Sequence, residues 1–219
     1  MKINVKKDVL SRQNREGARN RERFESTRTF TVNLMSSPGA GKTTLLEQTI
    51  TALQKEFRIG VIEGDLATDR DAQRLRKLGV KTVQINTVGG CHLNAELIAR
   101  ELPVFDLENT NILFIENIGN LVCPSGYDLG QHRKVALLST PEGNDKIPKY
   151  PVMFRRTDLT VVNKADLLPY VDFDVNQAKE DLRQINPEAG FLNVSAKTGA
   201  GMDDWIRWLK KEAEQCLNR

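Results

Sequence analysis

The chain has little of what marks several large protein classes. Only three of its 219 residues are cysteine, and aromatic residues make up 6%. No apolar run reaches the roughly 18 residues that a membrane-crossing helix needs. The N-terminus carries charge but neither the apolar core nor the small-residue cleavage site of a secretory signal. An odd cysteine count without such a signal disfavours a disulfide framework and leaves metal binding or thiolate chemistry open. We therefore expect a cytoplasmic protein that makes no membrane contact.

The composition is that of a folded protein. Hydrophobic residues make up 39% and charged residues 28%, and 15 glycines with 8 prolines are too few for a collagen-like or low-complexity chain. The net charge of +3 comes from residues 1–28, which hold nine Lys or Arg against four Asp or Glu. We expect a basic N-terminal arm at 1–28, helical over about 7–25 and loosely packed or in contact with a second subunit, followed by one domain at 29–219. Nucleic acid is disfavoured as a partner, because the arm has no aromatic residue before Phe24 to stack on bases.

Apolar strands alternate with helical segments along the domain. This alternation predicts an α/β fold with a mostly parallel sheet and helices on both faces. Ligands of such sheets bind at the carboxyl ends of the strands. The expected strands are 29–37, 58–65, 81–86, 111–117, 133–140, 159–166 and 190–197. One helix is expected directly after the first strand, and further helices are expected over 68–78, 93–102, 175–186 and 202–217.

A phosphate-binding loop is predicted between the first strand and its helix. Residues 36–43, SSPGAGKT, match the pattern G-x-x-x-x-G-K-[ST] except that Ser36 replaces the first glycine. The glycines let several backbone N–H groups point at one anion, and the helix adds its positive dipole end. The lysine should reach the β- and γ-phosphates, and the threonine hydroxyl should reach Mg²⁺. The expected nucleotide contacts here are Gly39, Ala40, Gly41, Lys42, Thr43 and Thr44.

Two later motifs indicate guanine as the base. Asp166, in the sequence NKAD, can accept hydrogen bonds from both N1–H and the exocyclic amine of guanine, and adenine lacks that paired donor edge. The sequence SAK after the last expected strand fits a second base-contacting loop. The expected base contacts are Asn163, Lys164, Asp166, Ser195, Ala196 and Lys197.

Acidic residues at two strand ends suggest a Mg²⁺ site and a slow hydrolase. Asp65 and Glu116, with the Thr43 hydroxyl, offer the oxygen ligands that Mg²⁺ prefers, although each acid could instead cap a helix or form a loop ion pair. Gly119 should sense the γ-phosphate, and we predict catalytic roles for Lys42, Asp65 and Gly119. Asn120 stands where a glutamine could orient water, so intrinsic hydrolysis should be slow.

Two cysteines and a histidine form a second candidate site. Cys91 and His92 are adjacent, and Cys123 lies shortly after Glu116. Thiolate and imidazole select Zn²⁺ or Ni²⁺ over Mg²⁺. The alternative is a buried apolar cysteine and a histidine satisfied within the protein. Cys216 is interpreted as a structural thiol without a partner and His132 as an exposed loop residue without a thiol neighbour.

Taken together, these motifs resemble the HypB family of hydrogenase nickel-incorporation GTPases, within the dimerising SIMIBI class of P-loop GTPases. The resemblance covers about residues 30–210 and rests on NLMSSPGAGKTTLLE, VIEGDLATDRDAQRL, CHLNAELI, FIENIGNLVCP, NKADLLPY and SAKTGAGMDDW. Family members commonly carry an aspartate where this chain has Asn94, and residues 1–28 have neither the Cys-rich motif nor the His-rich stretch of some members.

The resemblance implies a GTP-binding G domain at 29–219 with an embedded metal site. It implies GTP-dependent homodimerisation, Cys91, His92 and Cys123 as ligands of Ni²⁺ or Zn²⁺ near the dimer interface, and delivery of nickel to a [NiFe] hydrogenase large-subunit precursor with another accessory protein. The expected cofactors are GTP or GDP and Mg²⁺. Two alternatives stay open: a delivery module in which GTP mainly orders the protein, and a related GTPase that serves another metalloenzyme such as urease. A P-loop kinase is less favoured, because it would have no use for NKAD and SAK.

Overall fold

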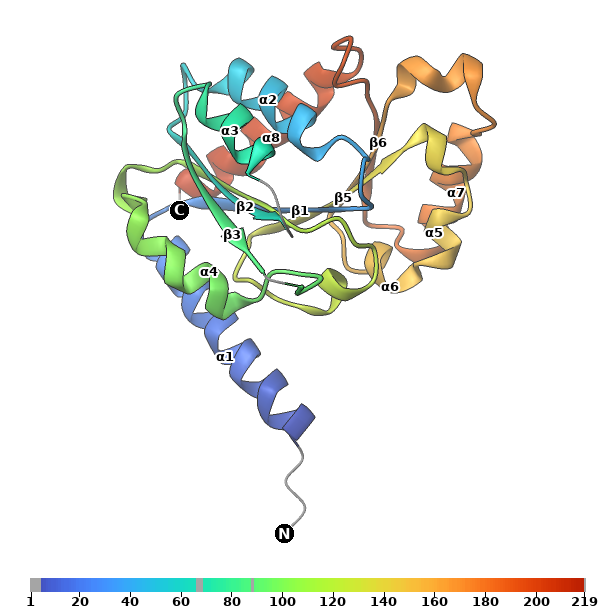
Figure 1. Ribbon diagram of the computed structural model, residues 1–219. Helices are drawn as coiled ribbons and strands as arrows, with labels where there is room; N and C mark the ends of the chain where they lie inside the picture. The colour runs from blue at the N-terminus through green and yellow to red at the C-terminus, as the bar shows by residue number, and fades with distance from the viewer. Residues whose placement is uncertain (1–4, 66–68, 88, 219) are drawn as a thin grey trace.

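The computed structural model describes residues 5–65, 69–87 and 89–218, and within them seven parallel strands form one sheet (Figure 1). Their order is β3-β2-β4-β1-β5-β6-β7. β1, in the centre, is buried at every position, because helices cover both faces of the sheet. The strands are β1 Phe30–Ser36, β2 Ile59–Asp65, β3 Lys81–Asn86, β4 Ile112–Glu116, β5 Arg133–Ser139, β6 Leu159–Asn163 and β7 Gly190–Asn193.

Helices pack on the two faces of this sheet. On one face, α2 and α8 share a core cluster with β1, β2 and β4. On the other face, α1 and α4 pack around Phe24 and Ile98, and the short helices α5 and α6 pack with α7 around Phe154. The helices are α1 Val5–Ser26, α2 Lys42–Leu53, α3 Arg70–Arg76, α4 Ala95–Glu101, α5 Lys146–Lys149, α6 Pro151–Phe154, α7 Val175–Ile185 and α8 Met202–Leu217.

The expected α/β fold is confirmed, and the differences lie at element ends and in short helical segments. The strand expected to run to residue 166 ends at Asn163, because Lys164 turns into the left-handed region at φ 61°. The last strand ends at Asn193, so SAK lies in a loop. Between 117 and 132, where no helix was placed from the sequence, one short 3-10 turn covers Cys123–Gly126. The short helices α5 and α6 were not expected.

The N-terminal helix is packed more tightly than an arm. Its first turns project from the body in Figure 1, but Asn20 and Phe24 are fully buried. The Asn20 amide donates to the carbonyls of Ala95 (2.9 Å) and Leu129 (3.2 Å). The second half of α1 therefore belongs to the core, and the expectation of loose packing is wrong for it. Among the described helices, none has the length and apolar character needed to cross a membrane.

Candidate nucleotide and metal sites

The loop between β1 and α2 has the geometry of an anion cradle. Gly39 and Gly41 adopt φ of 76° and 96°, which residues with a side chain rarely adopt. A Cβ on Gly41 would also lie 2.5 Å from the Asn163 amide nitrogen. Lys42 opens α2 and donates to the Ser36 hydroxyl (2.8 Å), and burial lowers the pKa of its ammonium group. The glycine-rich backbone of the loop and the half-buried Lys42 ammonium therefore lie together, as an anion site needs.

The two predicted base-contacting loops meet behind this cradle. The Asn163 amide donates to the Ala40 carbonyl (3.0 Å) and accepts from the Ala196 N–H (3.0 Å). Lys164 donates to the Gly39 carbonyl (2.7 Å). Asp166 accepts from the Ser195 hydroxyl (2.6 Å), which orients its carboxylate. Residues more than a hundred positions apart thus form one pocket edge, with Lys197 exposed beside it.

Buried carboxylates stand next to the phosphate loop. Glu116 is 3% exposed and accepts from the Thr43 hydroxyl (2.8 Å), and burial raises its pKa to about 7. Glu63 is also 3% exposed and is the register partner of Glu116 on the neighbouring strand. Burial, and then the charge of Glu116, raises the pKa of Glu63 to about 8. Each of the two carboxyl groups keeps one buried oxygen that finds no hydrogen-bond partner among the described residues.

Such oxygen atoms suit a hard divalent cation, which prefers carboxylate and hydroxyl ligands. Asp65 ends β2 two residues after Glu63, on the same face, and its charge contributes to the raised pKa of Glu63. The sequence predicted roles for Asp65 and Glu116 but not for Glu63. A signal was present, because a glutamate within an otherwise apolar strand needs a reason to be buried.

The segment that leaves β4, residues 117–123, touches the phosphate loop directly. A Cβ on Gly119 would lie 2.8 Å from both the nitrogen and the Cα of Pro38. Only a glycine allows this approach of two backbones. On the other side of the loop, Thr44 accepts from Arg74 of α3 (3.2 Å), which also forms an ion pair with Glu47 (2.6 Å).

The three predicted soft-metal ligands lie together. One ligand atom each of Cys91, His92 and Cys123 falls within 4.8 Å of the others. Cys91 is exposed and its sulfur lies 3.5 Å from His92 Nδ1. The neighbouring Cys123 thiol raises the pKa of Cys91, and burial lowers the pKa of His92, which favours its neutral form. Two sulfur atoms and a neutral imidazole are a donor set for a borderline-soft cation.

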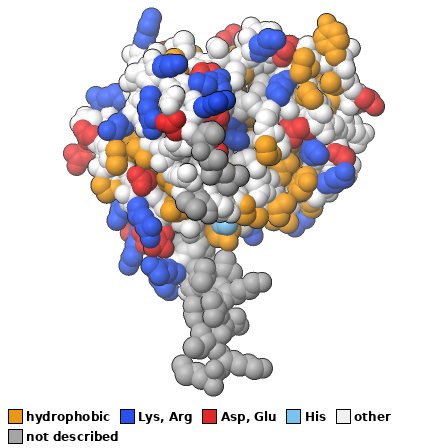
Figure 2. All heavy atoms as spheres, in the orientation of Figure 1, with side chains coloured by type: hydrophobic (Ala, Val, Ile, Leu, Met, Phe, Trp, Pro, Cys, Tyr) orange, Lys and Arg blue, Asp and Glu red, His pale blue; other side chains and the backbone are white. Residues whose placement is uncertain are grey.

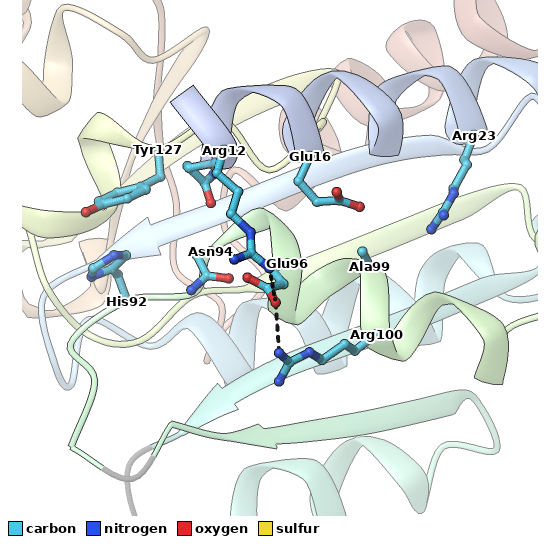
Figure 3. A pocket seen from close by; sticks show the side chains of 10 residues that line it. Arg12, Glu16, Arg23, His92, Asn94, Glu96, Ala99, Arg100 and Tyr127 are labelled. Atoms are coloured by element: carbon cyan, nitrogen blue, oxygen red, sulfur yellow. Dashed lines mark hydrogen bonds and ion pairs between the residues drawn. The ribbon is translucent and has the colours of Figure 1, made fainter. Parts of the chain in front are cut away.

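A cavity of about 550 Å³ adjoins this cluster between α1 and α4 (Figure 3). His92 stacks on Tyr127 at its edge, with ring centroids 4.1 Å apart. Farther along, Glu96 pairs with both Arg12 (3.4 Å) and Arg100 (2.9 Å). The histidine thus has an aromatic support and lies at the edge of a hollow lined by charged side chains. Acidic and basic side chains are interspersed over the face drawn in Figure 2.

Comparison with known proteins identifies the family. A model described as the CobW/HypB/UreG nucleotide-binding domain matches residues 30–193. The chain belongs to the CobW/HypB/UreG family. Hydrogenase maturation factor HypB of Escherichia coli K12 is 48% identical over 214 residues, which are 98% of this chain and 73% of that protein.

Solved HypB structures share this family's fold with the chain. HypB from Helicobacter pylori in complex with nickel superimposes with a TM-score of 0.89 at 41% identity, over 93% of this chain and 96% of that one. HypB from Archaeoglobus fulgidus gives 0.88 at 38% identity, over 93% and 99%.

One position where this family member departs from the expected pattern has a structural role. The Asn94 side chain accepts from the Leu97 N–H (2.9 Å) and caps the N-terminus of α4. Asparagine and aspartate cap helices about equally well. The replacement therefore keeps the helix that follows the Cys91 and His92 loop.

The interpretation of Cys216 and His132 is corrected. The Cys216 sulfur lies 3.6 Å from His132 Nε2, and His132 is half-buried. His132 Nδ1 accepts from the Thr31 N–H (3.1 Å), and its ring tilts against Phe30. The sequence gap of 84 residues hid this contact, because α8 returns across the sheet to the start of β5.

Proposed function

We propose that this chain is a GTP-hydrolysing metallochaperone that couples its nucleotide cycle and dimerisation to nickel insertion during [NiFe] hydrogenase maturation. Its relatives are named hydrogenase maturation factors, and one related structure was solved with nickel. One observation carries the proposal: residues 116–123 connect the two sites. Glu116 accepts from Thr43 at one end, Cys123 lies in the ligand cluster at the other, and Gly119 between them lies against the phosphate loop.

The nucleotide is GTP or GDP. Asp166, held by Ser195, presents a carboxylate to the paired N–H groups of guanine, and Asn163 joins the base loop to the phosphate loop. Adenine would leave this carboxylate without its partners, at a cost of about 1–3 kcal/mol.

The residues present fit Mg²⁺, which supplies charge neutralisation at the phosphates when bound. Thr43, Asp65 and Glu116 would hold it, and Glu63 adds a second buried carboxylate behind them. Lys42 stabilises negative charge on the β- and γ-phosphates, and the Gly119 N–H contacts the γ-phosphate. Asp65 orients the attacking water.

Slow hydrolysis follows from the role of Asn120. Its amide is engaged by the backbone of the cysteine loops rather than aimed at the phosphate loop. A slow intrinsic rate suits a switch whose two states last long enough to be read by a partner.

Nickel is the cargo, held by Cys91, His92 and Cys123, with Zn²⁺ as the competing ion. Three protein ligands leave a coordination position for water or for a group from a second subunit. A site that is open in this way releases its ion more readily than a closed one. The partners are a second copy of the chain, an accessory protein and the hydrogenase large-subunit precursor.

Size-exclusion chromatography with GDP and then with a GTP analogue, each with and without Ni²⁺, tests this function. We expect the GTP analogue to favour a dimer and to change nickel affinity in the wild-type chain, and Cys91→Ala to keep dimerisation but lose nickel. Nucleotide that changes neither the oligomeric state nor metal binding would overturn the proposal.

One alternative keeps the site but changes the role of the nucleotide. If GTP only orders the delivery module, a non-hydrolysable analogue should support a reconstituted maturation assay as well as GTP does.

A second acceptor, urease, is favoured by one observation, since a 42% identical protein of Helicobacter pylori is named a hydrogenase/urease maturation factor. A reconstituted maturation assay with hydrogenase precursor and with urease precursor shows which of the two acceptors receives nickel.

A further inference from the structure

Asn120 joins both cysteine loops through one side chain. Its Oδ1 accepts from the N–H groups of Val122 (2.8 Å) and Cys123 (3.3 Å). Its Nδ2 donates to the carbonyl of Cys91 (3.3 Å). A single amide group therefore contacts the main chain of two of the three proposed nickel ligands.

A second asparagine in the same segment holds the other side of His92. Asn117 is 1% exposed, and its Oδ1 accepts from the N–H groups of Leu93 (3.1 Å) and Ile118 (3.0 Å). Its Nδ2 donates to Asn33 of β1 (3.2 Å). The Cys91 and His92 loop is thus anchored on both sides to the segment that leaves β4.

The chemistry at position 120 requires an asparagine. An amide offers an acceptor and a donor at once, whereas an aspartate accepts only. The short side chain reaches the N–H groups two and three residues ahead, as in an Asx turn, and its nitrogen remains free to bridge to the other loop. The neighbouring Gly119 lies against Pro38 of the phosphate loop, so a displacement there also displaces Asn120.

We propose that Asn120 is the positioning residue that sets the spacing of Cys91 and Cys123, and that it carries the nucleotide state to the nickel site. Only the second part, the transmission of the nucleotide state, rests on the proposed function. Because Asn120 contacts the main chain of both cysteines, a displacement of Gly119 moves both of them. Nickel affinity then changes because the distance between the Cys91 and Cys123 sulfur atoms changes.

The test compares three variants of the full chain with wild type. Asn120→Ala removes all three hydrogen bonds. Asn120→Asp keeps the acceptor for Cys123 and loses the donor to Cys91. Asn186→Ala is the matched control, because Asn186 also bridges to main-chain atoms, the carbonyls of Phe154 (3.0 Å) and Thr157 (2.9 Å). It precedes β7, at the opposite edge of the sheet from β3, which Cys91 follows.

Two quantities are measured with GDP and with a GTP analogue: Ni²⁺ affinity by chelator competition, and the thiolate-to-nickel charge-transfer absorption. We expect Asn120→Ala to weaken nickel binding by about 10- to 100-fold, the range found when residues that orient metal ligands are replaced. We also expect a shifted absorption band and loss of the difference between the two nucleotide states. Asn186→Ala should behave as wild type in all three respects.

Asn120→Asp separates positioning from charge. Its added negative charge alone would strengthen cation binding, so weaker binding with an altered band supports the bridge to Cys91. Wild-type affinity, spectrum and nucleotide response in Asn120→Ala would overturn the inference. If wild type itself shows no nucleotide response while Asn120→Ala still binds nickel weakly, the positioning role stands and the coupling in the proposed function fails.

Discussion

Replacing Glu63 by glutamine should change how the stability of the protein depends on pH. Glu63 is 3% exposed and faces Glu116 across the β2 and β4 pairing. Burial, and then the Glu116 charge, raises its pKa from 4.5 to about 8. The folded chain therefore keeps a proton on Glu63 over a pH range in which the unfolded chain has lost it.

The sign follows from the raised value. The contribution of this proton to stability is complete below pH 4.5 and is lost as pH rises through about 8. Each proton of difference changes the free energy of unfolding by about 1.4 kcal/mol per pH unit. Between pH 5 and pH 7 the wild-type chain should lose roughly 2–3 kcal/mol through Glu63, and a glutamine at this position removes that loss.

Urea unfolding at pH 5, 6, 7 and 8, without nucleotide or divalent cation, measures the effect. The control is Glu56→Gln, whose side chain is 54% exposed and pairs with Lys210 at the surface. We expect the stability difference between wild type and Glu63→Gln to shift by about 2–3 kcal/mol between pH 5 and pH 7, and that for Glu56→Gln to stay within about 0.5 kcal/mol. Parallel profiles for wild type and Glu63→Gln would refute the burial argument.

Magnesium with nucleotide extends the same experiment. A cation next to these carboxylates favours their charged form and lowers their pKa values. The wild-type profile should therefore flatten between pH 5 and pH 8 when both are added. A profile that keeps its slope would mean that Glu63 does not face the cation.

Three further changes test other parts of the structure. Gly119→Ala places a methyl group 2.8 Å from the Pro38 backbone, so we expect weaker nucleotide binding in calorimetry and a loss of about 1–3 kcal/mol of stability; unchanged nucleotide affinity would contradict the contact. Asp166→Ala should weaken GTP binding by about 5- to 150-fold, the equivalent of 1–3 kcal/mol, and leave ATP binding as it was; equal losses for both nucleotides would exclude a base contact. Asn20→Ala strands two buried carbonyls and should destabilise the chain by about 1–3 kcal/mol in urea, whereas exposed Asn14→Ala should have little effect; equal effects would mean that α1 is not part of the core.

Local patterns predicted most of the sheet. Apolar runs such as 81–86 and 133–140 are long enough to be recognised, and each motif at a strand end fell at the carboxyl edge, as parallel topology requires. The strand ends were less accurate. Lys164 shows the reason, since its left-handed backbone is set by the contact with Gly39 and not by any local preference of lysine.

Features that depend on distant contacts could not be predicted from the sequence. The sequence marks Glu63 as unusual within its strand, but its pairing with Glu116 depends on the order of the strands in the sheet. The contact between Cys216 and His132 joins residues 84 positions apart. The packing of α1 depends on Asn20, a polar residue that no hydrophobic pattern marks as buried. The sequence marks Asn120 only by the absence of a glutamine, because its hydrogen-bond partners lie in loops that the sequence does not place.

The two candidate metal sites differ in chemistry although they share one segment. Glu116 and Thr43 offer hard oxygen atoms, and Cys123, seven residues later, offers a soft sulfur. Ions that prefer oxygen do not compete well for thiolate and imidazole, and the reverse also holds. The segment can therefore connect the two sites mechanically without exchanging their ions. A rigid connection is needed for that, and Asn117 and Asn120 supply it by tying the segment to the Cys91 loop at two points on either side of Gly119.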